Sequence, residues 1–151
     1  MNFIERLNSP VRSALSPGHI GAVVFVRWTV LADHFRGGAE NTVSAMATCT
    51  SEWFGGNPRS LLASVDRDSS SVTVLAEFAN CRTALLTAAT AHGRVAEDFV
   101  MLGNEGALYG RDLPEIGLQR LFDAREEMVD QEVLRMVQVS LKTGERAEDT
   151  G

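Results

Sequence analysis

From residue 36 to residue 56 the chain reads RGGAENTVSAMATCTSEWFGG, a helical pattern set between two pairs of glycines. Apolar side chains recur here with the three- and four-residue spacing of one helix face, at Val43, Met46, Ala47, Trp53 and Phe54. Gly55 stands where helices commonly end in a left-handed residue. The pattern predicts an amphipathic helix around which the other elements are arranged.

The composition indicates one globular domain that spans residues 1–151. The chain has 151 residues, 44% of them of hydrophobic types, which suffices to bury a core. A net charge of −6, with Lys142 as the only lysine, argues against nucleic acid or a membrane surface as a partner. No apolar run approaches the roughly 20 residues of a membrane-spanning helix. Two cysteines and the absence of a leader pattern at the N-terminus favour a cytoplasmic location.

Strand patterns fill much of the remaining chain. Residues 22–31 are rich in β-branched and aromatic side chains, and shorter strand-like runs follow at 60–65, 72–79, 82–91, 96–102 and 107–110. Asn80 and Cys81 are expected to form a two-residue turn between two of these runs. Helical spacing marks residues 3–16. It also marks a C-terminal helix that follows a capping box at Asp123 and Glu126 and ends at Gly144, and residues 145–151 are expected to be a polar tail.

This order of elements predicts an α+β fold. We expect an open, mostly antiparallel β-sheet with the helices packed on one face, because most strands are joined by short loops. The other face would present Val, Leu and Ala side chains without a covering helix. Such a face predicts a partner, most simply a second copy of the chain.

Motifs for a metal or a cofactor are missing from the sequence. The three histidines, His19, His34 and His92, are widely separated, and the cysteines do not have the spacing of a zinc site. The glycine-rich loops that bind phosphates or dinucleotides do not occur either. We therefore expect neither a bound metal nor a cofactor.

Two places carry side chains that are suited to acid–base or nucleophilic chemistry. Asp33 and His34 form the best acid/base pair by residue type, although adjacent residues of an extended segment point in opposite directions, and an ordinary loop histidine is the alternative. Cys49 is either a nucleophile or a small hydrophobic residue of the core.

Five further side chains have a binding and a structural interpretation. The aromatic residues Trp28, Trp53 and Tyr109 either line a pocket or pack in the core or an interface. Arg27 and Arg82 either hold a carboxylate or lie on a solvated strand face.

Four sequence pieces, in this order and spacing, resemble the C-terminal domain of the Gfo/Idh/MocA oxidoreductases, the glucose–fructose oxidoreductase and inositol dehydrogenase type. They are Gly18-His19-Ile20-Gly21 before a Val-rich strand, Gly37-Gly38 with the later Trp53-Phe54-Gly55, the turn Gly103-Asn104-Glu105-Gly106, and the helix end Leu141-Lys142-Thr143-Gly144. The resemblance covers nearly the whole chain. It implies association through the sheet, as in the family, and a domain without the nucleotide-binding half.

The same resemblance implies that the inherited chemistry is missing. The family's helix reads Gly-Gly-x-x-x-x-Asp-x-Gly-x-His-x-x-Asp-x-x-x-Trp-Leu, and here the two acids and the histidine fall on Thr42, Cys49 and Met46. None of these groups exchanges a proton near neutral pH in the way that an acid or a histidine does. The family's catalytic lysine and its cofactor site belong to the nucleotide-binding domain. Dehydrogenase activity by this chain alone is therefore not expected.

The leading hypothesis is a non-catalytic accessory subunit, or a module that binds a small molecule, paired with itself or with a full-length relative. Substrate contacts implied by the resemblance are Arg36, Thr42, Met46 and Trp53. The rival hypothesis is a cofactor-independent isomerase, lyase or cyclase that reuses the old substrate cleft. Its candidate residues are Asp33, His34, Arg36, Glu40 and Cys49. A third hypothesis is an excised half of a larger dehydrogenase.

Overall fold

The computed structural model describes residue 11 and residues 20–35, 37–68, 70–93, 96–110 and 129–150. Within these ranges the elements are β1 (Val23–Ala32), α2 (Gly38–Phe54), β2 (Ser60–Val65), β3 (Ser71–Glu77), a short 3₁₀ turn (Ala79–Cys81), β4 (Thr83–Thr90), β5 (Ala96–Gly103), β6 (Ala107–Tyr109), α4 (Gln131–Thr143) and β7 (Ala147–Glu148). The helix expected over residues 3–16 lies outside the described residues except at Val11, and so does the expected capping box at Asp123 and Glu126.

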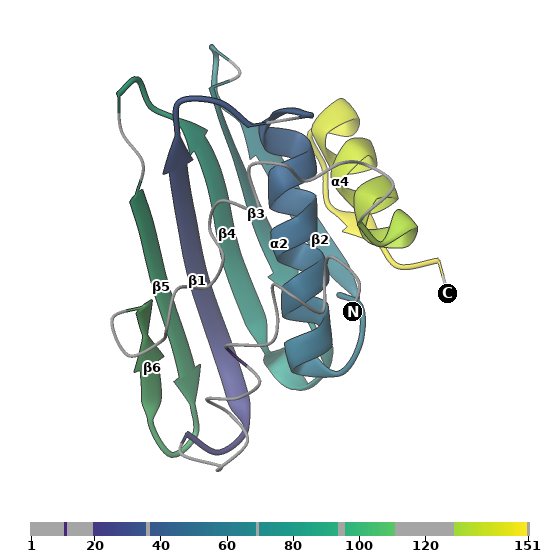
Figure 1. Cartoon of the computed structure of the whole chain (residues 1–151). Coiled ribbons are helices and arrows are strands. Elements are labelled where there is room, and N and C mark those ends of the chain that lie inside the picture. The colour runs from purple at the N-terminus through teal and green to yellow at the C-terminus, as the bar shows by residue number, and fades with distance from the viewer. Residues whose placement is uncertain are drawn as a thin grey trace.

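The strands form one seven-stranded sheet in the order β6-β5-β1-β4-β3-β2-β7. The predicted α+β fold with a mostly antiparallel sheet is confirmed, and both described helices lie on the same side of it (Figure 1). The parallel pairing of β1 with β4 was not predicted, because loop lengths do not show which strands become neighbours. This pairing brings β1 into the middle of the sheet, where its other neighbour is β5.

Alternation along the strands separates the helix side of the sheet from the opposite side. In β1, Val26, Trp28 and Val30 are completely buried, whereas Arg27 between them is exposed. Trp28 is flanked by Leu86 of β4 and, on the other side, by a phenylalanine of β5 that is also buried. α2 lies over β4 and β3, and α4 lies over β2 (Figure 1). The apolar core thus forms between the sheet and the two helices.

The face of the sheet opposite the helices, called the open face below, is covered by neither of them. One cross-strand row on it is mainly apolar and reads Tyr109, Val100, Arg27, Leu85, Leu75 and Leu62 from β6 to β2. The next row is polar and reads Asp98, Thr29, Thr87, Thr73 and Ser64. Large apolar side chains of this face stay at least 36% exposed, at Leu62, Leu75, Leu102 and Tyr109. The open apolar face expected from the sequence is present.

Backbone geometry tests two turn predictions, and it confirms one in full and the other in part. Asn80 and Cys81 between β3 and β4 have the expected positive φ values, 63° and 59°. The pairing of Glu77 with Thr83 and the bond from Phe78 N to Arg82 O leave three residues in the connection, Ala79–Cys81, rather than the predicted two. Gly55 ends α2 with a φ of 80°, and its N–H and that of Gly56 bond to the carbonyls of Glu52 and Ser51.

Two predictions about the C-terminal part need correction. α4 begins at Gln131 rather than near Asp123, because Asp130 caps it by accepting bonds from the N–H groups of Glu132 and Val133. The stretch after Gly144 is not only a polar tail, because Ala147 is 3% exposed and pairs with Leu61 as the edge strand β7. A single buried Ala within a polar run gives too weak a pattern to predict a strand.

Ser140 joins α4 to the edge of the sheet. Its hydroxyl accepts a hydrogen bond from Ala63 N at 2.8 Å and donates one to Glu145 O at 2.6 Å, and the residue is completely buried. The side chain therefore satisfies a backbone group of β2 and one of the segment that leads into β7.

We predict that Ser140→Ala lowers the free energy of unfolding by about 1–3 kcal/mol, because it leaves the buried N–H of Ala63 without a partner and removes the bond to the carbonyl of exposed Glu145. Thr143→Ala is the matched control. It removes an exposed hydroxyl of the same helix and should change stability by about 0.5 kcal/mol or less. Urea unfolding followed by circular dichroism measures both. Equal losses in the two variants would contradict the role given to Ser140.

Candidate functional site

The middle of α2 is buried on all sides. Every residue from Thr42 to Ser51 is buried, not only the apolar face that the sequence predicted. Polar side chains are part of this buried run, and their hydroxyls donate to carbonyls one turn earlier. The pairs are Thr42 to Gly38, Ser44 to Glu40, Thr48 to Ser44, Thr50 to Met46 and Ser51 to Ala47, at 2.8–3.4 Å. The helix thus satisfies its own buried hydroxyl protons.

The buried part of α2 includes the positions at which the family pattern has its two acids and its histidine. Thr42, Met46 and Cys49 each have 0% of their surface exposed. Their side chains are therefore closed to a ligand in this conformation. The substrate contacts expected of Thr42 and Met46, and a nucleophilic role of Cys49, would require α2 to be uncovered.

Cys49 is chemically inert in this setting. Burial raises the pKa of its thiol far above the ordinary value, and the nearby negative charge of Glu52 raises it further. A thiol that does not ionise is a poor nucleophile. The geometry favours the structural interpretation, in which Cys49 is a small apolar residue of the core.

Asp33 and His34 lie together at a hollow beside the start of α2. The hollow has a volume of about 330 Å³ and is also lined by Phe35, Gly37, Gly38, Ala39 and Thr90. Asp33 accepts a hydrogen bond from Gly93 N, so its carboxylate holds the turn after β4. His34 is exposed, and no carboxylate of the described residues hydrogen-bonds to it. Glu40 lies nearby in the first turn of α2. Arg36 lies outside the described residues.

The aromatic and arginine candidates have mainly structural surroundings. Trp28, Trp53 and Phe99 form a cluster with ring centroids 5.6–5.8 Å apart, and Trp28 Nε1 donates to Glu97. Trp53 Nε1 is buried without a hydrogen-bond partner among the described residues.

The remaining candidates lie apart from this cluster. Tyr109 is exposed on the open face, where Arg27 pairs with Asp98 at 3.1 Å. Arg82 donates to Ala79 O and lies over the ring of Phe54 at 5.1 Å. The structure therefore does not gather these residues into one pocket.

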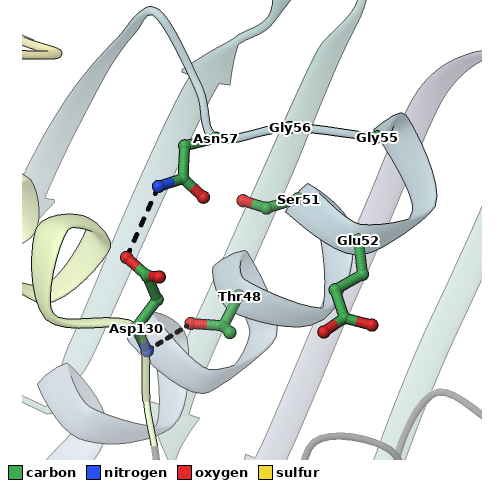
Figure 2. Close-up of a pocket in the computed structure, with 7 residues that line it drawn as sticks. All are labelled: Thr48, Ser51, Glu52, Gly55, Gly56, Asn57 and Asp130. Atoms are coloured by element: carbon green, nitrogen blue, oxygen red, sulfur yellow. Dashed lines mark hydrogen bonds between the residues drawn. The ribbon is translucent and has the colours of Figure 1, made fainter. Parts of the chain in front are cut away.

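A second hollow lies at the opposite end of α2, against the start of α4 (Figure 2). It has a volume of about 280 Å³ and is lined by Thr48, Ser51, Glu52, Gly55, Gly56, Asn57 and Asp130. Two hydrogen bonds close its rim, from Asp130 N to Thr48 Oγ1 at 3.2 Å and from Asn57 Nδ2 to Asp130 Oδ1 at 3.5 Å. The sequence prediction missed this site. Its signal was the polar stripe at Thr48, Ser51 and Glu52, which helical spacing places on one side of α2.

The described part of the chain contains neither a metal-binding cluster nor a membrane-spanning helix. Its His, Cys, Asp and Glu residues form no group of three or more that could hold a metal ion. None of its helices has the length and apolar character needed to cross a membrane.

We predict that a thiol reagent distinguishes the two cysteines. Iodoacetamide should alkylate exposed Cys81 in the folded protein. The alkylation rate of Cys49 should be lower by about a thousandfold or more, since reaction at Cys49 requires the core to open. Peptide mass spectrometry locates the adducts, and unfolding in urea should expose both thiols. Cys81→Ser is the control that should abolish native labelling. Comparable native rates at Cys49 and Cys81 would show that α2 opens readily.

Comparison with known proteins identifies the fold. No protein-family model matches the sequence, and no curated protein sequence does either. A putative myo-inositol dehydrogenase from Sinorhizobium meliloti 1021 matches with a TM-score of 0.71 at 15% identity, over 99% of this chain and 64% of that one. The apo scyllo-inositol dehydrogenase from Lactobacillus casei matches with a TM-score of 0.71 at 12% identity, over 99% and 63%.

A probable dehydrogenase from Thermotoga maritima matches with a TM-score of 0.68 at 12% identity, over 96% of this chain and 62% of that one. The chain thus spans less than two thirds of the length of these relatives. At such low identities the likeness concerns the fold alone. The resemblance seen in the sequence is confirmed at that level: this chain has the fold of the C-terminal domain of the Gfo/Idh/MocA inositol dehydrogenases.

Proposed function

We propose that this chain is a non-catalytic module derived from an oxidoreductase C-terminal domain, which pairs with a second copy through its open face. The observation that carries the proposal is the apolar cross-strand row on that face. Leu62 and Leu75 on neighbouring strands are each 36% exposed, and Tyr109 at the other end of the row is 41% exposed. Burying such a row against another surface releases water from apolar area, which is the main driving force of association.

The charges on the open face favour a second copy as the partner. Arg27 pairs with Asp98 at 3.1 Å, and Glu77 pairs with Arg146 at 2.5 Å. Each chain carries a net charge of −6, so two copies repel one another at long range. Because these two ion pairs form within each copy, their four charges add little repulsion at the contact itself, and Glu148 of β7 at the edge of the sheet is the remaining acid among the described strand residues of this face. A face that carries an apolar row, a hydroxyl row and ion pairs closed within one copy is complementary to itself.

The loss of the inherited chemistry supports the non-catalytic part of the proposal. The positions that resemble the family's acids and histidine hold Thr42, Met46 and Cys49, all closed to solvent. The part of this fold that can still serve a function is then its surface, and in particular the open face. The module would act in the cytoplasm, where Cys49 and Cys81 stay as free thiols.

Two alternatives remain open to the same experiments. The partner could be a full-length relative rather than a second copy, with this chain as its accessory subunit. The rival hypothesis of a cofactor-independent enzyme would have to use Asp33, His34 and Glu40 at the start of α2, since Cys49 is inaccessible. We do not propose it, because Asp33 is engaged with Gly93 and no described acid hydrogen-bonds to His34.

We predict that the chain is a dimer in solution and that Leu75→Lys converts it to a monomer. The substitution places a charge in the centre of the apolar row, and a second copy would have to desolvate that charge, which should weaken pairing about tenfold or more. Val139→Lys is the matched control, because Val139 is 38% exposed on α4, away from the open face. Sedimentation velocity measures the oligomeric state, and circular dichroism shows that both variants stay folded.

Three results would sort the alternatives. A dimer that persists in Leu75→Lys but dissociates in Val139→Lys would place the interface on the helix side and refute the proposal. A wild-type chain that is monomeric alone and co-purifies with a full-length relative would favour the accessory-subunit alternative. A wild-type monomer that binds neither copy nor relative would leave the open face without a pairing role.

A further inference from the structure

β2 has the composition of a strand that pairs readily with another chain. Its sequence, Ser-Leu-Leu-Ala-Ser-Val over residues 60–65, contains no charged residue and no proline. Soluble proteins commonly keep edge strands from pairing by means of charges, proline, a bulge, short length or a covering element. β6, at the other edge of the described sheet, has only three residues. β2 has six and no protection in its own sequence, so it depends on the elements that cover it.

Two elements cover the side of β2 that faces away from β3. β7 pairs with Ser60 and Leu61, and its pairing ends there. The N–H of Ala63, two residues further on, is bonded to the hydroxyl of Ser140 in α4 at 2.8 Å. β7 belongs to residues 145–150, called the strap below, which follow α4 toward the C-terminus and are yellow in Figure 1. The strap is the part of this cover that could leave without unfolding a helix.

The strap is held mainly by polar contacts at the surface. Arg146 pairs with Glu77 at 2.5 Å, and the two side chains are 43% and 44% exposed. Thr150 donates to Glu132 from its N–H at 3.2 Å and from its hydroxyl at 3.0 Å. Ala147 is the one apolar side chain of the strap, and burying a methyl group contributes little.

An ion pair on α4 completes the anchor of the strap. Arg135 bonds to both carboxylate oxygens of Glu132, at 2.8 and 2.6 Å, and to the carbonyl of Glu148 in the strap at 2.9 Å. The bonds from Arg135, followed by those from Thr150, lower the pKa of Glu132 to about 2. The carboxylate is therefore ionised throughout the neutral range. Ionic strength is then the variable that acts on the anchor, because salt screens exposed ion pairs.

We propose that residues 145–150 are a protective strap that opens before the rest of the fold, and that its opening frees the edge of β2 to pair with β2 of a second copy. A segment held by exposed ion pairs and little apolar area lies at the low end of local stability. Two identical strands that pair antiparallel about a twofold axis are complementary to each other, and uncharged β2 brings no like charges together. This edge is a different surface from the open face.

Hydrogen exchange, followed by peptide mass spectrometry on the whole chain, measures the opening. Leu75→Lys is present throughout, so that pairing through the open face does not contribute. Raising NaCl from about 0.02 M to about 0.5 M should speed exchange in the strap about fivefold and leave exchange in α2 unchanged, because salt screens the anchor. Arg146→Gln should speed exchange in the strap at low salt. Lys142→Gln, which removes a charge of α4 outside the anchor, is its control.

Sedimentation velocity at fixed low salt measures the pairing. Ala147→Asp places a charge at a buried position of the strap and should hold the strap open. The dissociation constant for self-association should then fall about tenfold or more. Val139→Asp is the matched control, because it places the same charge on an exposed residue of α4.

A second substitution tests whether β2 is the pairing strand. Val65 is 47% exposed, and alternation along β2 places it on the side of buried Leu61 and Ala63 rather than on the open face. Adding Val65→Lys to Ala147→Asp should restore the monomer, because a charge on an edge strand opposes pairing with a copy of itself.

Each other outcome would overturn the proposal. Strap amides that exchange no faster than those of α2 would show that the strap does not open separately. An Ala147→Asp chain that stays monomeric with its strap open would show that β2 is not a pairing surface. Association that persists after Val65→Lys would place the contact elsewhere. Circular dichroism identifies a variant that fails to fold; if Ala147→Asp does so, Arg146→Gln combined with Glu132→Gln opens the strap without changing a buried residue.

Discussion

The rest of the structure depends on how α2 satisfies hydrogen bonds inside the core. The helix is enclosed over ten consecutive residues, yet five of its side chains carry hydroxyls, and each hydroxyl donates to a carbonyl one turn earlier. Small side chains let neighbouring elements approach closely, and the internal bonds keep their oxygens from being orphaned. A charged residue has no such solution, because burying an unpaired charge is far more costly than burying a hydroxyl. The enclosure of α2 and the absence of acids and histidines from its middle are therefore two aspects of one constraint.

Local sequence patterns predicted the elements whose cause is local. β2 was predicted residue for residue, and a turn with positive φ values at Asn80 and Cys81 was expected, although the connection has three residues rather than two. The parallel pairing of β1 with β4 could not be predicted in this way, since it depends on which strands meet after the chain has crossed the sheet. The full enclosure of α2 was also missed. Its apolar stripe predicts one buried face, and Ser and Thr residues look the same in a sequence whether they face water or the core.

The two candidate surfaces differ in how visible they were. The open face was expected, because alternating Val and Leu residues on several strands predict an apolar sheet face that no helix covers. The hollow beside Asp130 was not expected, because its parts come from distant places in the chain: Ser51 in α2, Asn57 in the following turn and Asp130 before α4. Only the tertiary structure brings the Ser51 hydroxyl and the Asp130 carboxylate to the same hollow. The hollow is also not lined by Thr42, Met46 or Cys49, the positions that the family resemblance pointed to, which are buried within α2.

The central place of β1 has a consequence for how the protein is made. β1 is the first strand of the sheet to leave the ribosome, but both of its neighbours, β4 and β5, are encoded later. β2, β3 and β4 pair in sequence order through short connections and can assemble among themselves. Until β4 has been synthesised, β1 has no neighbouring strand to pair with. Its apolar side chains, including that of Trp28, then lack the contacts of the finished sheet. We expect the nascent chain to expose this segment longest and to depend most on protection from aggregation there.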